Sequence, residues 1–229
     1  MIRNILIRGK NVPFLKGENV LMDHFNKVEQ AKKFQNYLNS WEQSNVEVKQ
    51  IEVSYVYMFG QNVGFVNLVV DAYLNGIRLP GFVFLRGDAV AILLLVNKKM
   101  VLTQQFRVPV GKFTIEAPAG MMDEQGDFGG VAAKEIKEET GISIQHNEMQ
   151  YLQDMLVSPG GSDEVIHLFV VEKNMEQAQL DELCQKTHGE EGEGEQIKLV
   201  IQDFTWENIL KTQDSKLIAA AAAYYSKKQ

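Results

Sequence analysis

The sequence has little of several features that mark particular classes of protein. It holds one cysteine, which cannot form an intramolecular disulfide, and four scattered histidines that lack the spacing of a zinc site. Its apolar runs are short: Ala89–Val96 has eight residues, whereas roughly 20 are needed to cross a bilayer. With 23 Lys and Arg against 30 Asp and Glu, the net charge of −7 disfavours nucleic-acid binding. These absences predict a cytoplasmic protein without membrane or nucleic-acid partners, in which any metal is held by oxygen ligands.

What is present is an ordinary globular composition, with 45% apolar and 23% charged residues over 229 positions. That length suits one catalytic domain with a smaller appendage. Apolar residues recur every three or four positions over residues 23–44, which predicts one helix. They then alternate over 46–74, and Asn75-Gly76 follows as a hairpin signal. We therefore expect an N-terminal helix and an antiparallel β unit of about three strands in residues 1–85, and a second domain in 86–229.

The second domain should alternate strands and helices. Strand patterns occupy residues 89–96, 100–106, 113–116, 151–156, 165–171 and 197–201. A helical pattern covers 127–140, with Asp127 as its cap and Gly141 as its terminator, and a closing helix is expected over 206–228. Residues 181–195 hold six acidic side chains and three glycines, which predicts a solvated loop.

The residues that carry chemistry cluster on the helix over 127–140. At about 100° per residue, Glu135, Glu138 and Glu139 share one arc of its surface. Three carboxylates on one arc fit either a solvated helix face or a divalent-cation site, because like charges at this spacing repel one another unless water or metal offsets them. A tight Pro-Ala-Gly loop before the helix could add a carbonyl ligand. This favours the second interpretation and a hard ion such as Mg²⁺ or Mn²⁺.

Residues 120–142 resemble the Nudix box, G-x5-E-x7-R-E-U-x-E-E-x-G-U, where U is an aliphatic residue. Seven positions match, namely Gly120, Glu135, Ile136, Glu138, Glu139, Gly141 and Ile142. Two positions depart from it, because Gly126 replaces the first glutamate and Lys134 replaces the arginine. Two further motifs are similar to those of ADP-sugar pyrophosphatases, including the plant-type ADP-sugar diphosphatases: Glu116-Ala117-Pro118-Ala119-Gly120 and Ser158-Pro159-Gly160-Gly161-Ser162-Asp163-Glu164.

This resemblance implies the α/β Nudix fold, an α/β/α sandwich with a mixed sheet, preceded here by the small antiparallel β unit. It implies that Mg²⁺ or Mn²⁺ is bound by Ala119, Glu135, Glu138 and Glu139. The catalytic residues that it implies are Glu138, Glu139 and Glu164, and the substrate-binding residues are Arg107, Arg86 and Glu116.

Alternatives stay open for single residues. Asp163 could exchange roles with Glu164, which could also be a solvated acid. Arg107 and Arg86 could form structural ion pairs, and Glu116 could be a partner of Arg107. Lys134 could orient a box glutamate, or it could form an ordinary helix salt pair with Glu138.

The implied reaction is metal-dependent hydrolysis of an ADP-sugar, either ADP-ribose or ADP-glucose, to AMP and a sugar phosphate, carried out by a homodimer. One alternative is a sensor that binds ADP-ribose without hydrolysing it, and another is a Nudix pyrophosphatase for a different nucleoside diphosphate derivative. Both tandem glutamates, Glu138 and Glu139, are present, which favours an enzyme over a sensor. A purely structural interaction module would not explain three motifs in the same order.

Overall fold

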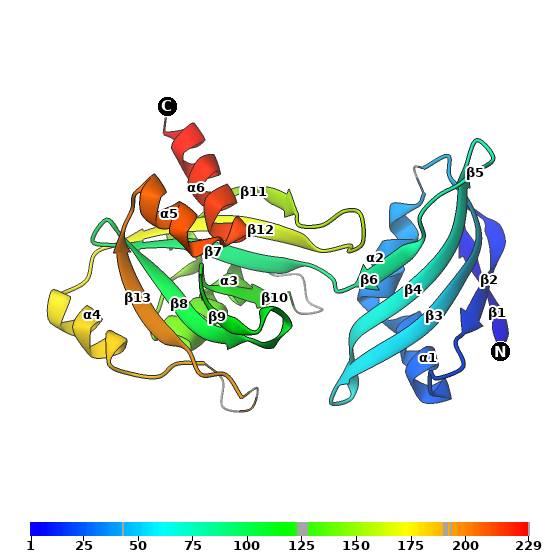
Figure 1. Cartoon of the computed structure of the whole chain (residues 1–229), viewed down its shortest axis with the longest axis horizontal. Helices are drawn as coiled ribbons and strands as arrows, with labels where there is room; N and C mark the ends of the chain where they lie inside the picture. Colours follow the sequence, from blue (N-terminus) through cyan, green and yellow to red (C-terminus); the bar gives the residue numbers. More distant parts are fainter. Residues whose placement is uncertain (43, 123–127, 190–191, 193, 229) are drawn as a thin grey trace. The chain divides into compact units, whose positions relative to one another are not determined.

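The structure, a computed structural model, describes residues 1–42, 44–122, 128–189, 192 and 194–228. The chain divides into two compact units, drawn in Figure 1 with strands and helices labelled. The first unit contains Met1–Gly87 and Leu156–Glu164, and the second contains Asp88–Met155 and Val165–Gln229. The segment Leu156–Glu164, which we expected within the second domain, thus belongs by its contacts to the first unit.

The first unit is built on a six-stranded sheet in the order β1-β2-β3-β4-β5, with β6 also paired to β4. Its strands are β1 Ile2–Ile7, β2 Lys10–Lys16, β3 Glu47–Phe59, β4 Asn62–Leu74, β5 Ile77–Arg78 and β6 Phe82–Leu85. The β2–β3 pair is parallel and the other pairs are antiparallel. The three antiparallel strands expected from residue 46 onward are present as β3, β4 and β5, and the sheet also contains β6 and an N-terminal hairpin that turns through Arg8 and Gly9, both with positive φ.

Two helices cover one face of this sheet, α1 (Met22–Gln30) and α2 (Lys32–Ser40). The single helix predicted over 23–44 is wrong, because Ala31 between them is extended, with φ −65° and ψ 131°. The break is invisible in the sequence, since Ala31 is a good helix former and the apolar spacing continues across it. Phe25 and Phe34, one from each helix, both stack on Phe14 of β2 in the core.

The second unit is built on a seven-stranded sheet in the order β11-β12-β7-β8-β13, with β10 also paired to β7 and β9 to β8. Its strands are β7 Ala89–Val96, β8 Lys99–Arg107, β9 Lys112–Glu116, β10 Ala119–Met121, β11 Met149–Leu156, β12 Val165–Lys173 and β13 Lys198–Asp203. The β7–β12 pair is parallel, whereas β8 and β10 run antiparallel to β7. The sheet is therefore mixed, as predicted.

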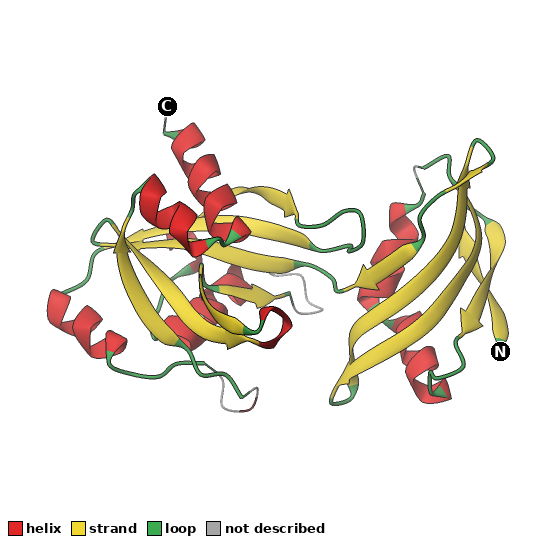
Figure 2. Ribbon diagram, viewed as in Figure 1, coloured by secondary structure: helices red, strands yellow, loops and turns green. Residues whose placement is uncertain are grey.

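Helices lie on both faces of this sheet (Figure 2). They are α3 Phe128–Thr140, α4 Gln177–Cys184, α5 Trp206–Thr212 and α6 Ser215–Lys227, with short 3-10 helices at Val108–Val110 and His146–Glu148. Alternate residues of β7 enter two separate cores: Leu93 packs with Leu217 of α6, and Ile92 packs with Ile136 of α3. Strand β7 is thus covered by helices on both faces, which explains its continuous apolar run. This arrangement confirms the α/β/α sandwich.

Two expectations for the second unit need correction. The closing helix over 206–228 is two helices, because Gln213 adopts a left-handed conformation and Asp214 then caps α6. The acidic stretch from residue 181 is not all loop, since α4 extends to Cys184. The expected cap Asp127 and the box departure Gly126 lie outside the described residues. No helix in the described part of the chain is long and apolar enough to span a membrane.

Candidate active site

Helix α3 presents its acidic arc along the side of its buried face. Val131, Ala132 and Ile136 pack into the core against the sheet, which fixes the rotation of the helix. Glu139 is then drawn inward and is only 3% exposed, whereas Glu135 and Glu138 are half-buried. The three glutamates therefore share one arc of the helix, as their spacing predicted, but they differ in burial.

Residues 117–120, which lead into β10 and include its first two residues, contact the acidic arc of α3. The Ala119 N–H donates to Glu139 Oε2 at 3.0 Å, and the Ile92 N–H donates to the carbonyl oxygen of Pro118 at 2.9 Å. At Gly120 an added Cβ would lie 1.9 Å from Cδ of Glu135. A side chain there would displace the Glu135 side chain, which gives the glycine at this position of the box a steric reason. The structure thus brings Ala119, Glu135 and Glu139 close to one another, and their role as metal ligands stays a prediction.

Negative charge accumulates at this junction. The pKa of Glu139 is raised to about 8, first by burial and then by the charges of Glu135 and Glu195, against the opposing hydrogen bond from Ala119 and the charge of Arg107. Glu195 was not singled out from the sequence, where it lies in the acidic stretch. Its backbone and side chain lie against Gly189, whose N–H donates to the Glu138 carbonyl at 3.0 Å.

The donor set fits a hard divalent cation, because carboxylate and carbonyl oxygens are the ligands that Mg²⁺ and Mn²⁺ prefer. A cation would also favour the ionised form of Glu139, which burial disfavours. Among the residues that the structure describes, no group of three or more His, Cys, Asp or Glu side chains stands in metal-binding geometry.

Lys134 contacts one of the box glutamates. Its Nζ lies 3.4 Å from Glu138 Oε2, four residues further along α3, and its side chain is 62% exposed. This is the geometry of the helix salt pair that the sequence left open. The pair places a cation beside Glu138 without the two parallel hydrogen bonds that arginine can make.

Arg107 and Glu116 pair with each other. Glu116, 8% exposed, accepts hydrogen bonds from Arg107 Nε at 2.8 Å and Nη2 at 3.1 Å, and from Thr114 Oγ1 at 2.6 Å. Burial alone would raise its pKa, but these hydrogen bonds and the charge of Lys216 lower the pKa to about 2. Of the two interpretations of Glu116, the geometry matches that of partner to Arg107.

Two residues of this network were missed in the sequence. Lys216 Nζ donates to Glu116 Oε2 at 2.9 Å and to Asp214 Oδ1 at 2.8 Å, and Asp214 Oδ2 accepts from the Ala117 N–H at 2.9 Å. An Asp before a helix is a recognisable capping signal, so Asp214 could have been found as a cap. Nothing local could have linked Lys216 to Glu116, because 100 residues separate them.

The remaining site candidates lie in the first unit. Asp163 accepts hydrogen bonds from the backbone N–H groups of Arg86 at 2.7 Å and Gly87 at 3.1 Å. Arg86 Nε lies 3.0 Å from Glu164 Oε1, and its Cζ lies 5.6 Å from the ring centroid of Phe65. This ion pair is the structural role that the sequence left open for Arg86. The backbone contacts of Asp163 also give it a different task from that of Glu164, whose carboxylate faces a guanidinium.

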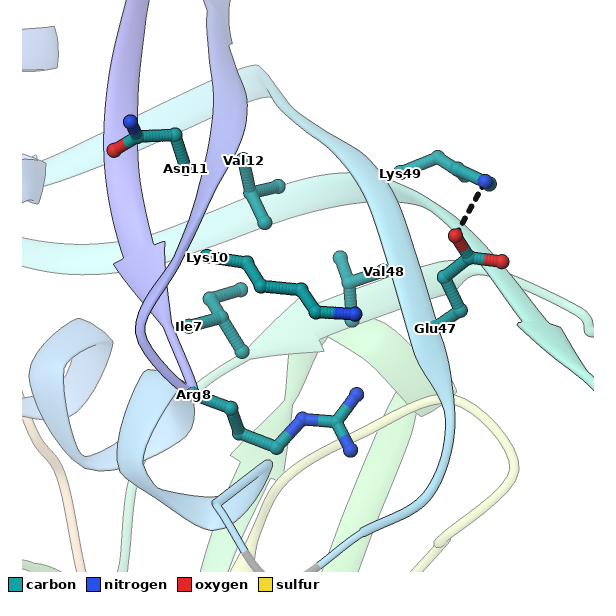
Figure 3. Close-up of a pocket in the computed structure, with 8 residues that line it drawn as sticks. All are labelled: Ile7, Arg8, Lys10, Asn11, Val12, Glu47, Val48 and Lys49. Carbon is teal, nitrogen blue, oxygen red and sulfur yellow. Dashed lines mark hydrogen bonds and ion pairs between the residues drawn. The ribbon is translucent and has the colours of Figure 1, made fainter.

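A cavity of about 180 Å³ in the first unit contains none of the predicted site residues (Figure 3). Two of its basic groups already have partners, since Lys49 pairs with Glu47, and Arg8 donates to the carbonyl oxygens of Ser44 and Val46. We assign no function to this cavity.

Comparisons with known proteins agree with this geometry. A family model described as the NUDIX domain matches residues 85–218. Nudix hydrolase 14, chloroplastic, of Arabidopsis thaliana is 34% identical over 216 residues, which cover 83% of this chain and 69% of that protein. ADP-ribose pyrophosphatase of Bacillus subtilis is 27% identical over 165 residues, which cover 69% of this chain and 83% of that protein.

The fold comparison points the same way. A crystal structure of an ADP compounds hydrolase matches with a TM-score of 0.58 over 80% of this chain and 94% of that chain. At 16% identity this likeness concerns the fold alone. The family match covers more than half of the chain and includes the carboxylates of α3 and the segment that they meet. The chain belongs to the Nudix family.

Proposed function

We propose that this protein hydrolyses the diphosphate of an ADP-sugar, such as ADP-ribose or ADP-glucose, to AMP and a sugar phosphate. The observation that carries the proposal is the contact of Glu139 and Glu135 with Ala119 and Gly120, because it joins the Nudix box to the E-x-P-A-G motif in one place. The names of the relatives, a Nudix hydrolase and an ADP-ribose pyrophosphatase, support the same substrate class.

The residues that would hold a divalent cation, Mg²⁺ or Mn²⁺, are Glu135, Glu138, Glu139 and the carbonyl of Ala119. When bound, the metal would offset the charge of the diphosphate and make a bound water more acidic. The chain's own contribution is orientation. The Ala119 N–H fixes one carboxylate oxygen of Glu139, and Glu116 holds two nitrogens of the Arg107 guanidinium.

Arg107 is proposed to contact the diphosphate with the edge that Glu116 does not use. Its side chain is 40% exposed, so a phosphate can approach while the pair with Glu116 stays intact. A fixed guanidinium plane is suited to recognising phosphate oxygens. Glu164 is proposed as the group that takes the proton from the attacking water, and Arg86 as a further phosphate contact, on the similarity of residues 158–164 to the subfamily motif.

The proposal is tested by incubating the purified protein with ADP-ribose, ADP-glucose and GDP-mannose, with Mg²⁺, with Mn²⁺ and with EDTA, and measuring nucleoside monophosphate by chromatography. We expect AMP from the ADP-sugars with metal and none with EDTA. Undiminished turnover in EDTA would contradict the metal site. Binding of ADP-ribose by calorimetry without AMP release would support the sensor, and preferential release of GMP would support another nucleoside diphosphate substrate.

We also propose that the protein is a homodimer formed through the first unit and that it is cytoplasmic. Aromatic side chains of β3 and β6 are 44–59% exposed, namely Tyr55, Tyr57, Phe59 and Phe82. Such a group of exposed apolar side chains is typical of an interaction surface. Light scattering should give twice the mass of the chain, 25.9 kDa, and Tyr57→Ser with Phe82→Ser should reduce it to the monomer mass. A monomeric wild-type protein would contradict the dimer.

A further inference from the structure

Four charged side chains, all but Arg107 largely buried, form a charged network beside the 117–120 segment of the second unit. Arg107 binds Glu116 through two hydrogen bonds, Lys216 joins Glu116 at 2.9 Å, and Asp214 joins Lys216 at 2.8 Å. Glu116 and Asp214 are 8% and 7% exposed, and the side chain of Lys216 is 15% exposed. The two positive and two negative side chains alternate along this network. The network is therefore neutral as a whole, and each charge in it has a partner of opposite sign.

This charged network contacts the backbone of the 117–120 segment, which in turn contacts Glu139. Asp214 Oδ2 accepts the Ala117 N–H at 2.9 Å, and Glu116 is the residue before Ala117. Two residues further on, the Ala119 N–H donates to Glu139 at 3.0 Å. The 117–120 segment therefore contacts the C-terminal helix α6 on one side and the acidic arc of α3 on the other.

Asp214 is itself held in a single orientation. As the residue that caps α6, it accepts the Lys216 N–H at 3.1 Å through Oδ1, and its own N–H donates to Thr212 Oγ1 at 3.2 Å. Its two carboxylate oxygens thus have separate tasks: Oδ1 binds Lys216 and Oδ2 binds the Ala117 backbone. A carboxylate with both oxygens engaged transmits the position of the first turn of α6 to the 117–120 segment.

We propose that Asp214 and Lys216 are positioning residues of the active site: they hold the 117–120 segment where its Ala119 backbone meets Glu139. The inference rests on the proposed function, in which Glu139 and the Ala119 carbonyl bind the metal. Neither residue needs to touch substrate. Their role resembles that of the outer partners of metal ligands, whose loss leaves the ligands present but poorly placed.

The proposal makes a specific prediction for Lys216→Met, which removes the ammonium but keeps an unbranched apolar side chain. Mn²⁺ affinity and kcat should each fall by about 10- to 100-fold, the range typical for outer partners of metal ligands. The KM for ADP-ribose should change by less than about threefold, because the Arg107–Glu116 pair remains and no substrate contact is lost. Hydrogen exchange of the amides in residues 117–120 should accelerate in the metal-free protein.

A matched control is available on the neighbouring helix. Lys211→Met removes a lysine that pairs with Glu207 at 2.6 Å on α5, where both side chains are solvent-exposed. The experiment measures Mn²⁺ binding by electron paramagnetic resonance without nucleotide, hydrogen exchange, and kinetics with ADP-ribose for both variants. Lys211→Met should match the wild type in all three. If Lys216→Met matches it as well, the positioning role is overturned; an increase in KM alone would overturn it too.

Two further variants guard against loss of folding. Lys216→Arg keeps a cation that can donate to both carboxylates, and it should hold Mn²⁺ affinity within about threefold of the wild type. If Lys216→Met does not fold, the double variant Glu116→Gln with Lys216→Met removes one charge of each sign and should still bind Mn²⁺ weakly; wild-type affinity there would overturn the proposal. A wild-type protein that releases no AMP would instead contradict the proposed function, and Mn²⁺ binding and hydrogen exchange would still decide the positioning role.

Discussion

Glu139 and Glu116, two buried carboxylates of the second unit, have opposite electrostatic surroundings. Burial raises the pKa of Glu139 to about 8, because the Ala119 N–H and Arg107 do not offset burial together with the charges of Glu135 and Glu195. Burial also favours the neutral form of Glu116, yet hydrogen bonds from Arg107 and Thr114 and the charge of Lys216 lower its pKa to about 2. Nearly equal burial, 3% and 8% exposure, thus gives opposite preferences for charge.

This difference is the one that we expect between a structural carboxylate and a metal-binding one. The charge of Glu116 is offset within the chain, so this residue can stay ionised without any ligand. The groups around Glu139 instead favour its neutral form, and a divalent cation would stabilise the ionised form. Buried charge that the chain itself does not compensate is therefore a physical sign of a binding site.

The largest effect is expected for Glu139→Gln. The variant should lower kcat by two orders of magnitude or more, the order expected when a metal ligand is lost. Its melting temperature should stay the same or rise, because glutamine does not ionise, whereas burial and the charges of Glu135 and Glu195 oppose the ionisation of Glu139 in the folded protein. Kinetics with ADP-ribose at saturating Mg²⁺ and thermal unfolding test both parts, with the exposed Glu207→Gln as control. Loss of activity with a lower melting temperature would contradict the comparison.

Glu116→Gln should have the opposite effect on stability. It leaves Arg107 and Lys216 in a buried site with one negative partner fewer, and breaking a buried pair in this way costs about 3 kcal/mol of unfolding free energy. Urea denaturation of the variant and the wild type measures the difference. A decrease of less than about 1 kcal/mol would be close to the effect of an ordinary surface substitution. It would show that the network of Arg107, Glu116, Lys216 and Asp214 does not need this charge.

A pH series sharpens the same contrast. The folded-state pKa of Glu116, about 2, lies below its ordinary value of 4.5, so its ionisation stabilises the fold above pH 4.5. That contribution is lost as the pH falls from 4.5 toward 2, and at full size it is about 3 kcal/mol. The stability advantage of the wild type over Glu116→Gln should therefore shrink across this window in urea titrations. A constant difference between pH 4.5 and pH 2.5 would contradict the assignment.

Local patterns predicted much of the candidate site. The spacing of Glu135, Glu138 and Glu139 gave their shared arc, and Gly120 matched the box at a position where a side chain would overlap Glu135. Both features depend on residues within one helix and the segment that precedes it. The mixed sheet and its two covered faces were implied by the family resemblance, and the fully apolar β7 agrees with them.

Other features could not be predicted, because their causes are not local. Lys216 reaches Glu116 only through the tertiary fold, and the charge of Glu195 acts on Glu139 across a stretch that was expected to be solvated loop. The breaks at Ala31 and Gln213 interrupt regions of continuous helical spacing. In each case the sequence pattern is compatible with two structures, and packing at a distance selects one.

The smallest effect is expected at Lys134, which contacts Glu138 of the acidic arc on α3. An exposed pair four residues apart contributes only about 0.3–0.5 kcal/mol to helix stability, so the melting temperature should hardly change in any variant. Lys134→Arg should preserve or raise kcat with little change in KM, because a guanidinium can hold Glu138 in a more fixed orientation than an ammonium. Lys134→Ala should lower kcat several-fold, since Glu138 then loses the neighbouring cation at 3.4 Å. Kinetics at saturating Mg²⁺ for both variants, with the exposed Lys137→Ala of the same helix as control, decide the point. Equal rates for wild type, Arg and Ala would make Lys134 a solvated surface residue with no part in orienting Glu138.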